Sequence, residues 1–503
     1  MSTPLNPHGA TGDTTTFVPE LLYVGGRFHA ERALVCDASG RIVSVARAED
    51  LPKRAARVSM PGRAMLPGMV NAHSHAFQRV IRGRTEYRSS AHASDSFWTW
   101  REMMYVAASR LTPEDLYDAS RMAFLEMALS GITSVGEFHY LHRTPKGDEY
   151  DDPNLLAREV VRAARDVGLR IALLRVAYAR AGYRKEPDER QRRFIEPDPE
   201  TFIRNTESLM RDLAPRDSTP LAAWLGVAPH SVRAVPREYL REVSAFALAR
   251  GLPLHMHVAE QPAEVEACIT ETGRTPVALL ASEGVLGPRF TGVHAVHVTA
   301  EEIAALRDAG ACVCACPTTE RNLGDGVVPA ELFFKEGVTL ALGTDSHAQI
   351  DLLEDARELE YHLRLLSLRR NVLAPAGAEG VDDESRVDTH AAQASETEAF
   401  GMSALAARLF ECASASGAHS IGAHAGAFEP GLAADFFTVA LDDPSIAGAS
   451  TEDLLPAIVF SLSRTAVRET AIGGRLVVES GAHPAQREIV LRFAALQRRL
   501  WNE

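Results

Sequence analysis

The chain has 503 residues, of which 46% are hydrophobic and 24% are charged, and its formal net charge is −14. A chain of this length can bury a large core, and its acidic balance argues against a surface that binds nucleic acid or anionic membranes. We therefore expect a small-molecule partner, with no nucleic acid and no membrane.

The N-terminal sequence, the lengths of the apolar stretches and the cysteines indicate in which cellular compartment the protein is found. The first residues, MSTPLNPHGATGDTTTF, have neither the basic nor the apolar segment of a signal peptide, and no stretch approaches 18 unbroken apolar residues. The six cysteines are too few and too scattered for a disulfide framework, and the three in ACVCAC have the spacing of one strand face. These features predict a cytoplasmic protein.

Short strand-like segments occur at both ends of the chain. After a polar, predicted disordered stretch up to about Thr16, the segments ELLYV, RFHAERALVCD and RIVSVA are separated by glycine-containing turns. The pattern returns from Pro430 with ADFFTVAL and a hairpin around Gly473 and Gly474. Neither end has enough strands to bury both faces of a core, so we predict that the two ends form one β-sandwich.

Between these ends, apolar runs alternate with helix-like stretches. The eight runs are AMLPGMVNAH, GITSVGEF, RIALLRV, AAWLGVAPH, PLHMHV, TGVHAVH, ACVCAC and VTLALGTD. The helix candidates span residues 113–130, 155–167, 236–250, 300–308, 352–368 and 402–415, the first with Thr112 as N-cap and Pro113 at its first position. Eight buried strands, each followed by a helix, predict an α/β fold, the (β/α)8 TIM barrel, with functional residues at the carboxyl ends of the strands.

The predicted domain division follows from these patterns. A barrel occupies residues 64–415, and the β-sandwich combines residues 1–63 with 416–503, which end in a helix over 486–500. A polar segment from about 375 to 397 is interpreted as a flexible insertion.

Metal-ligand residue types recur at the predicted strand ends. The first strand ends in His73-Ser74-His75, whose imidazoles share one face of a strand. Three imidazoles and one carboxylate can hold Zn²⁺ or Fe²⁺ with an open position for water, and the cation makes hydroxide available near neutral pH. We therefore predict a divalent metal ion, zinc or iron, whose ligands are His73, His75, His257 and Asp345.

Two alternatives to this ligand set stay open. His255 lies one layer deeper on the same strand face as His257, and Asp345 could instead be the N-cap of the helix that begins at Leu352.

Two further residues are candidates for proton transfer. Glu260 lies three residues past His257 and suits proton transfer between a water and a departing nitrogen. His294 could hydrogen-bond the hydroxide or the substrate, whereas His297 is as readily a surface residue. We predict Glu260, His294 and Asp345 as the catalytic residues, and the division of proton steps among them stays open.

Several motifs follow one another along the barrel part of the chain: LPGMVNAHSHAFQR with RGRTE after it, DSFWTWREMMY, TSVGEFHYLHR, APHSVRAV, HMHVAEQ, CPTTERNLGDG and LGTDSH. Together they resemble the amidohydrolase superfamily, and within it the deiminase family that acts on N-formimidoyl-L-glutamate in bacterial histidine degradation. They span residues 66 to 368. The resemblance implies hydrolysis of N-formimidoyl-L-glutamate to N-formyl-L-glutamate and ammonia, and a homodimer.

The resemblance also implies five substrate contacts: Gln78, Arg101, Tyr140, His230 and Arg233. A substrate with two carboxylates requires fixed guanidinium groups, which the two arginines could supply. Arg82 and Arg84 remain further candidates.

The number of metals follows from the lysines. Two-metal relatives of this barrel bridge their metals with a carboxylated lysine at the end of the fourth strand, where this chain reads WLGVAPH, and none of its four lysines ends a predicted strand. One metal ion is therefore predicted.

Two rival functions remain. The chain could be an aminohydrolase of an aromatic base such as guanine or a triazine, or a barrel scaffold that has lost catalysis.

Overall fold

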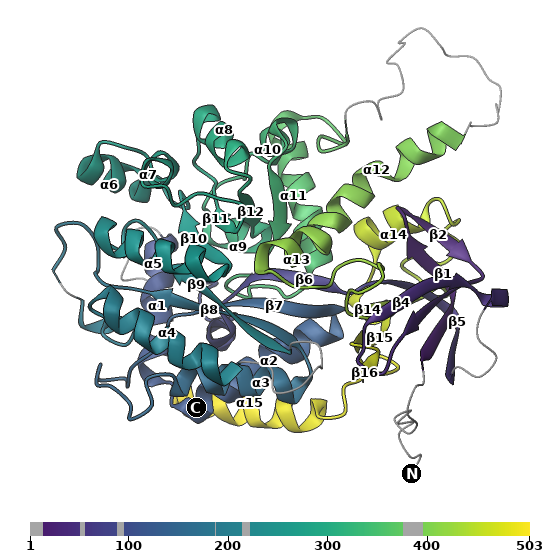
Figure 1. Cartoon of the computed structure of the whole chain (residues 1–503), viewed down its shortest axis with the longest axis horizontal. Helices are drawn as coiled ribbons and strands as arrows, with labels where there is room; N and C mark the ends of the chain where they lie inside the picture. The colour runs from purple at the N-terminus through teal and green to yellow at the C-terminus, as the bar shows by residue number, and fades with distance from the viewer. Residues whose placement is uncertain are drawn as a thin grey trace, which may run out of the picture.

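The computed structural model describes residues 14–50, 56–87, 95–186, 188–213, 222–375 and 396–502. Most of the predicted disordered N-terminus and nearly all of the predicted insertion from 375 to 397 lie outside these residues. Figure 1 shows a large barrel surrounded by helices and, beside it, a smaller β-rich part that combines the beginning and the end of the chain. Within the described ranges, no helix has the length and apolar content needed to cross a membrane.

Eight parallel strands form the barrel, and each pairs with the next along the chain. They are β6 (Met69–Ser74), β7 (Ile132–His139), β8 (Arg170–Ala177), β9 (Ala223–Pro229), β10 (Leu254–Val258), β11 (Phe290–His294), β12 (Cys312–Ala315) and β13 (Thr339–Leu342). An isolated parallel bridge between Ser74 and Asp345 joins the first strand to the segment after the last one, so the barrel nearly closes. All eight strands coincide with the eight apolar runs, and the predicted barrel is confirmed.

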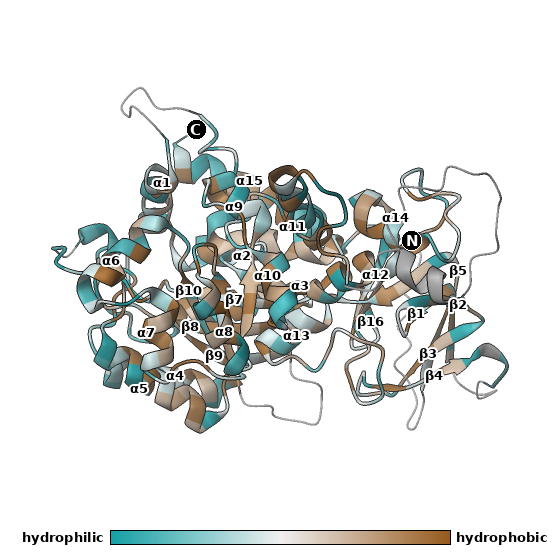
Figure 2. Ribbon diagram, turned by 90° about the horizontal axis from the view of Figure 1, so that it is seen from above, coloured by the Kyte–Doolittle hydropathy of each residue, from teal (hydrophilic) through white to brown (hydrophobic). Residues whose placement is uncertain are grey.

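Helices cover the outside of the barrel, and several match the predicted ranges. They are α1 (Phe97–Arg110), α2 (Pro113–Leu129), α3 (Leu155–Val167), α4 (Pro199–Leu213), α5 (Arg237–Arg250), α6 (Pro262–Thr272), α7 (Pro276–Ser282), α8 (Ala300–Asp308), α9 (Pro317–Leu323), α10 (Ala330–Glu336) and α11 (Leu352–Ser367). The predicted N-cap Thr112 accepts a hydrogen bond from the Asp115 amide, and the Asp115 side chain accepts one from the Thr112 amide. Figure 2 shows that hydrophilic residues colour the outer helices, such as α5 and α6, more than the strands they cover.

The accessory β part is built from both ends of the chain, as predicted. Its strands are β1 (Thr15–Val24), β2 (Arg27–Ala30), β3 (Arg32–Cys36), β4 (Ile42–Arg47), β5 (Ala56–Pro67), β14 (Phe436–Ala440), β15 (Val467–Ile472) and β16 (Arg475–Val478). Hydrogen bonds connect them into one mixed sheet, in which β5 lies between β1 and β14. The rings of Phe17 and Phe436 meet in its core at 4.8 Å between centroids, so strands from opposite ends of the chain share one hydrophobic cluster.

The apolar run that begins at Ala64 differs from its prediction as a single barrel strand. Its first half is the end of β5, where Pro67 pairs with Phe436 of the accessory sheet, and the barrel strand begins only at Met69. Gly68 separates the two strands, and a Cβ atom there would lie 2.3 Å from the Thr133 hydroxyl oxygen. One continuous apolar run therefore serves two sheets, and the domain division at residues 63 and 415 stays a prediction.

Of the remaining helices, one covers the amino end of the barrel and another lies along its outside. The remaining helices are α12 (Glu396–Cys412), α13 (Ala415–Ile421), α14 (Leu454–Ser461) and α15 (Gln486–Trp501). α13 contacts β6, β7, β12 and β13, and the Ser420 hydroxyl lies 3.2 Å from that of Thr291 near the start of β11. α15, the predicted terminal helix, lies along α2, where Arg121 holds Glu488 through two hydrogen bonds of 3.0 and 2.7 Å. The amino end of the barrel is thus filled, and its carboxyl end remains for a site.

A glycine contact between the two ends of the chain can be tested. Gly40 has φ +80°, and a Cβ atom there would lie 2.5 Å from the Gly473 carbonyl oxygen. Gly40→Ala should lower the free energy of unfolding by about 3 kcal/mol, because left-handed strain and a backbone clash add. The control Gly25→Ala has φ +61° and open space around the new methyl group, so it should cost only about 1 kcal/mol. Equal denaturant midpoints for the two variants would contradict the contact.

Candidate metal centre and active site

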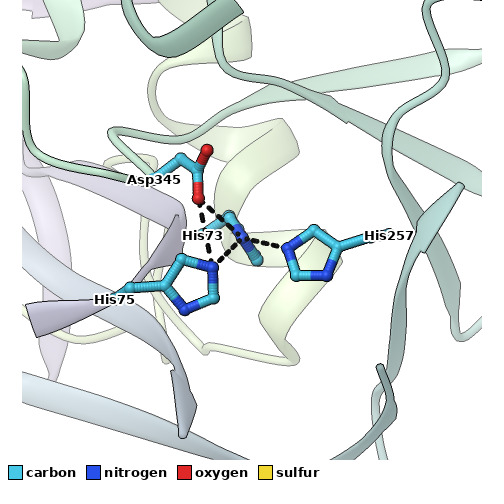
Figure 3. A group of neighbouring side chains, drawn as sticks. All are labelled: His73, His75, His257 and Asp345. Atoms are coloured by element: carbon cyan, nitrogen blue, oxygen red, sulfur yellow. Dashed lines mark hydrogen bonds and ion pairs between the residues drawn. The ribbon is translucent and has the colours of Figure 1, made fainter. Parts of the chain in front are cut away.

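Four predicted ligands meet at the carboxyl end of the barrel. His73 and His75 come from the end of β6, His257 from β10, and Asp345 from the segment after β13, and their ligand atoms all lie within 4.8 Å of one another (Figure 3). Backbone hydrogen bonds from the Asp345 amide to the His73 carbonyl and from the His75 amide to the Asp345 carbonyl, each 3.0 Å, hold the first and last strands together. The barrel closure itself therefore brings the carboxylate to the imidazoles.

The donor atoms have the spacing expected of ligands that share one metal ion. The Nε2 atom of His73 lies 3.1 Å from those of His75 and His257, and Oδ1 of Asp345 lies 3.3 Å from His73 Nε2 and 3.1 Å from His75 Nε2. Neighbouring ligand atoms bound to one ion at 2.0–2.1 Å lie roughly 3 Å apart, so these four separations fit a common ion.

The tautomers of the imidazoles also fit a cation. His75 Nδ1 donates to the Phe138 carbonyl at 3.0 Å, and His257 Nδ1 donates to the His230 carbonyl at 3.1 Å. Because each Nδ1 carries the proton, each Nε2 presents a lone pair to the centre. A metal ion can accept the lone pairs of both nitrogens together with those of His73 and Asp345, and the four residues form a His-His-His-Asp metal site.

Burial sets the protonation states that metal binding needs. It lowers the pKa of His73 to about 3, despite the hydrogen bond to Asp345 that favours the protonated ring. Burial alone would raise the pKa of Asp345, but the imidazoles of His73 and His75 beside its carboxylate lower it well below its ordinary value of 3.8. A neutral imidazole beside a carboxylate is the state in which both groups bind a metal.

Glu260 and His294 lie beside the ligands. His294 Nε2 is 3.6 Å from Glu260 Oε1 and 3.8 Å from Asp345 Oδ2, and all three side chains are buried. Burial lowers the pKa of His294, but the carboxylates of Glu260, Glu320 and Asp345 outweigh it and raise the pKa well above 6.5. Burial raises the pKa of Glu260 to about 7. The predicted catalytic residues are therefore gathered into one group.

Two carboxylates that support this group were missed from the sequence. Glu320 on α9 lies with Oε1 3.2 Å from His294 Nδ1, and Glu137 on β7 accepts hydrogen bonds from the Ser74 hydroxyl at 2.6 Å and the Ala76 amide at 2.8 Å. Both residues lie in the recognised motifs, CPTTERNLGDG and TSVGEFHYLHR. Their buried positions at or near strand ends were the available signal.

The predicted substrate contacts line one cavity together with the metal ligands. The walls of this cavity include Gln78, Arg101, Tyr140, His230 and Arg233 as well as His75, His257, Glu260, His294 and Asp345. Gln78 Nε2 donates to the Tyr140 hydroxyl at 2.8 Å, which leaves the Gln78 carbonyl oxygen without a partner. All five residues are thus placed where a ligand could touch them.

The two arginines of the cavity have unused donors. Arg101 Nε and both Nε and Nη1 of Arg233 are buried without a hydrogen-bond partner, and within the described part of the chain neither arginine makes an ion pair. The indole of Trp98 lies 4.6 Å from the Arg101 guanidinium carbon and 5.9 Å from that of Arg233. Buried guanidinium groups without partners are costly, so this arrangement is suited to an anionic ligand.

The alternative metal ligands are not part of the centre. His255 Nε2 lies 2.9 Å from the Ser420 carbonyl oxygen of α13, which is below the barrel, so this ring points away from the ligand cluster. The N-cap of α11 is Asp351, whose side chain accepts from the Leu353 and Glu354 amides, and not Asp345.

The alternative arginines have other contacts. Arg82 donates to the His347 carbonyl at 2.6 Å and to Glu126 at 2.7 Å, and Arg84 lies with its guanidinium carbon 4.7 Å from the Trp501 ring. His297, the other histidine considered, is partly buried, with Nε2 2.8 Å from the Asp325 carbonyl oxygen. None of these three residues lines the cavity.

This barrel with a His-His-His-Asp centre at its carboxyl end is that of a metal-dependent hydrolase. The amidohydrolase family profile matches residues 64–477, and the chain belongs to that family. It is 36% identical over 436 residues to formimidoylglutamate deiminase of Pseudomonas aeruginosa, a match that covers 86% of this chain and 88% of the relative.

Two solved structures are similar to this chain. A crystal structure of an amidohydrolase from Brucella melitensis aligns with a TM-score of 0.82 and 32% identity, over 97% of this chain and all of that one. An adenosine deaminase from Xanthomonas campestris, solved with bound zinc, aligns with a TM-score of 0.77 at 20% identity, over 97% of this chain and 99% of that one. The second likeness concerns the fold alone.

The packing of His73 against the last strand gives a test of the metal centre. Gly343 follows β13, and a Cβ atom there would lie 2.7 Å from His73 Cβ and 3.0 Å from the His73 nitrogen. Gly343→Ala should displace His73 and lose most of the bound metal, because a shift of about 1 Å spoils a metal site.

Its control is Gly292→Ala in β11, where the nearest atom, on Phe290, is 3.5 Å away. Metal per chain, measured by plasma mass spectrometry after reconstitution with zinc, should stay at the parent level in the control. Full metal content in both variants would show that His73 does not hold the ion.

Proposed function

We propose that this chain hydrolyses N-formimidoyl-L-glutamate to N-formyl-L-glutamate and ammonia, with one divalent metal ion, zinc rather than iron. The observation that carries the proposal is the pair of cavity arginines, Arg101 and Arg233, whose buried N–H groups without acceptors share a cavity with the metal site. A linear substrate with two carboxylates supplies the hydrogen-bond acceptors that these groups lack. The similarity to the Pseudomonas aeruginosa deiminase supports the same substrate.

The chemistry follows from where the residues lie. A bound metal ion of this kind lowers the pKa of a water to near 7 and so supplies a nucleophile at neutral pH. The protonated His294 ring holds the attacking water by donating a hydrogen bond to it, and Asp345, whose Oδ2 lies 3.8 Å from His294 Nε2, accepts the proton of that water. Glu260, whose Oε1 lies 3.6 Å from the same His294 Nε2, protonates the departing nitrogen. The C–N bond to that nitrogen breaks, ammonia leaves, and the formimidoyl group becomes a formyl group.

The substrate contacts divide between the two ends of the ligand. Arg101 and Arg233 bind carboxylate oxygens, while Gln78, Tyr140 and His230 bind the polar atoms nearer the metal. Gln78 suits this role because its carbonyl oxygen has no partner and its amide is fixed by the Tyr140 hydroxyl. A cytoplasmic location and a homodimer stay predictions.

Two other functions are weighed against this one. In an aminohydrolase of an aromatic base, the aromatic residues of the cavity, among them Trp100 and Tyr140, could contact the base. Such a substrate would leave the N–H groups of the two arginines without acceptors. A scaffold without catalysis has no use for a complete ligand set of four residues beside Glu260 and His294.

The decisive assay measures ammonia released by the purified protein from N-formimidoyl-L-glutamate, guanine and adenosine, before and after removal of the metal with a chelator. Release from N-formimidoyl-L-glutamate alone, abolished by the chelator and restored by zinc, is the expected result. Release from a base with none from the amidine would replace the proposal with the rival aminohydrolase, and no release from any of them would favour the scaffold.

The role of Glu260 predicts a separation of metal binding from turnover. Glu260→Gln should keep the metal, because Glu260 is not among the four gathered ligands, and lose turnover by about 10²–10⁴-fold, the usual contribution of a proton-transfer group. Glu266→Gln changes an exposed glutamate of α6 and serves as the matched control. Parent-like rates of ammonia release in Glu260→Gln would remove this residue from the mechanism.

A further inference from the structure

A buried glutamine fixes two tyrosine hydroxyls at the edge of the cavity. Gln191 ends the short helix η3 (Glu189–Gln191), in the segment between β8 and α4, and is 1% exposed. Its Nε2 atom donates to the Tyr178 hydroxyl at 2.6 Å and to the Tyr105 hydroxyl at 2.8 Å. An oxygen that accepts from the glutamine keeps its own proton for another acceptor. Because both hydroxyl oxygens accept from Gln191, each phenol group is held in a fixed orientation and keeps its own proton for donation.

The two hydroxyls lie next to each other and stay protonated. Burial raises the pKa of Tyr178, and the adjacent Tyr105 hydroxyl raises it further. Burial also raises the pKa of Tyr105. When the Tyr105 oxygen accepts from both Gln191 and Tyr178, its two lone pairs are used, and its proton must point elsewhere.

The Tyr105 hydroxyl proton is therefore left to point into the cavity that contains Arg101 and Arg233. Tyr105 and Tyr178 both line the cavity, and the Arg101 guanidinium carbon lies 5.4 Å from the centre of the Tyr105 ring. A row of rings in contact separates this region from the metal: the centroid of the Tyr178 ring lies 4.7 Å from that of His230 in an edge-on contact, and the His230 centroid lies 4.9 Å from that of the ligand His257. A ligand with one end at the metal would therefore have its other end beside Tyr105.

We propose that Tyr105 is a specificity-determining residue, whose hydroxyl completes with Arg101 and Arg233 a subsite for the substrate carboxylate farther from the metal. Gln191 and Tyr178 are positioning residues that aim this hydroxyl. The inference rests on the proposed function, since it assigns one carboxylate of that substrate to a place in the cavity. A phenol donor adds direction to the charge of the arginines, and so selects a carboxylate at a fixed distance from the amidine.

The test compares two substrates that differ only in this carboxylate, N-formimidoyl-L-glutamate and N-formimidoyl-L-norvaline. For Tyr105→Phe, kcat/KM on the glutamate compound should fall about tenfold or more, mostly through KM, because a hydrogen bond to a charged group is lost. On the norvaline compound kcat/KM should change less than about twofold, since it lacks the side-chain carboxylate that the Tyr105 hydroxyl would bind. The matched control is Tyr239→Phe, a buried tyrosine whose hydroxyl donates to the Glu196 carbonyl and which does not line the cavity.

The outcomes separate this inference from the proposed function. An unchanged selectivity in Tyr105→Phe, or an equal loss on both substrates, overturns the role of Tyr105 while the parent activity stands. A parent enzyme that is inactive on N-formimidoyl-L-glutamate overturns both. If Tyr105→Phe does not fold, Gln191→Met carries the test: a selective loss of severalfold on the glutamate compound is expected, and parent-like selectivity rejects the network.

Discussion

The structure depends on the convergence of imidazole lone pairs on one point. His75 and His257 have committed their Nδ1 protons to the carbonyls of Phe138 and His230, so their Nε2 atoms can only accept, and the one Nε2 atom of His73 that both of them face has at most one proton to donate. In a buried pocket such an arrangement is unfavourable for a protein alone. A bound metal ion makes the same arrangement favourable, because each lone pair then binds the ion. The nearly closed barrel fixes the positions of the strands that carry the ligands.

The cavity next to this centre also contains buried polar groups without partners, but here these groups are hydrogen-bond donors and not lone pairs. Arg101 and Arg233 hold buried N–H groups that the described chain does not satisfy, as the metal site holds lone pairs that it does not satisfy. The metal ion satisfies the lone pairs, and a ligand that carries carboxylates beside its reactive amidine satisfies the N–H groups of the arginines, which an aromatic base does not. The proposed substrate therefore follows from unsatisfied groups rather than from the fold, which many activities share.

Much of this could be predicted from the sequence, because a parallel barrel collects the carboxyl ends of its strands at one rim. His73, His257 and Asp345 could be identified as neighbours from their positions at the ends of apolar runs, although about 270 residues separate the first from the last. The run from Ala64 was misjudged, because an apolar segment does not show that Gly68 divides it between two sheets. Glu320 was missed although it lies in a recognised motif near a strand end, and the Gln191 network was missed because it depends on contacts between distant segments that no local pattern encodes.

The central claim is that one metal ion lies between His73, His75, His257 and Asp345. Anomalous diffraction from crystals of the protein as purified, recorded on both sides of the zinc absorption edge, tests it most directly. The account predicts a single strong peak within about 2.3 Å of a nitrogen of each imidazole and an oxygen of the carboxylate. No peak at any metal edge, or a peak bound by other residues, would contradict it.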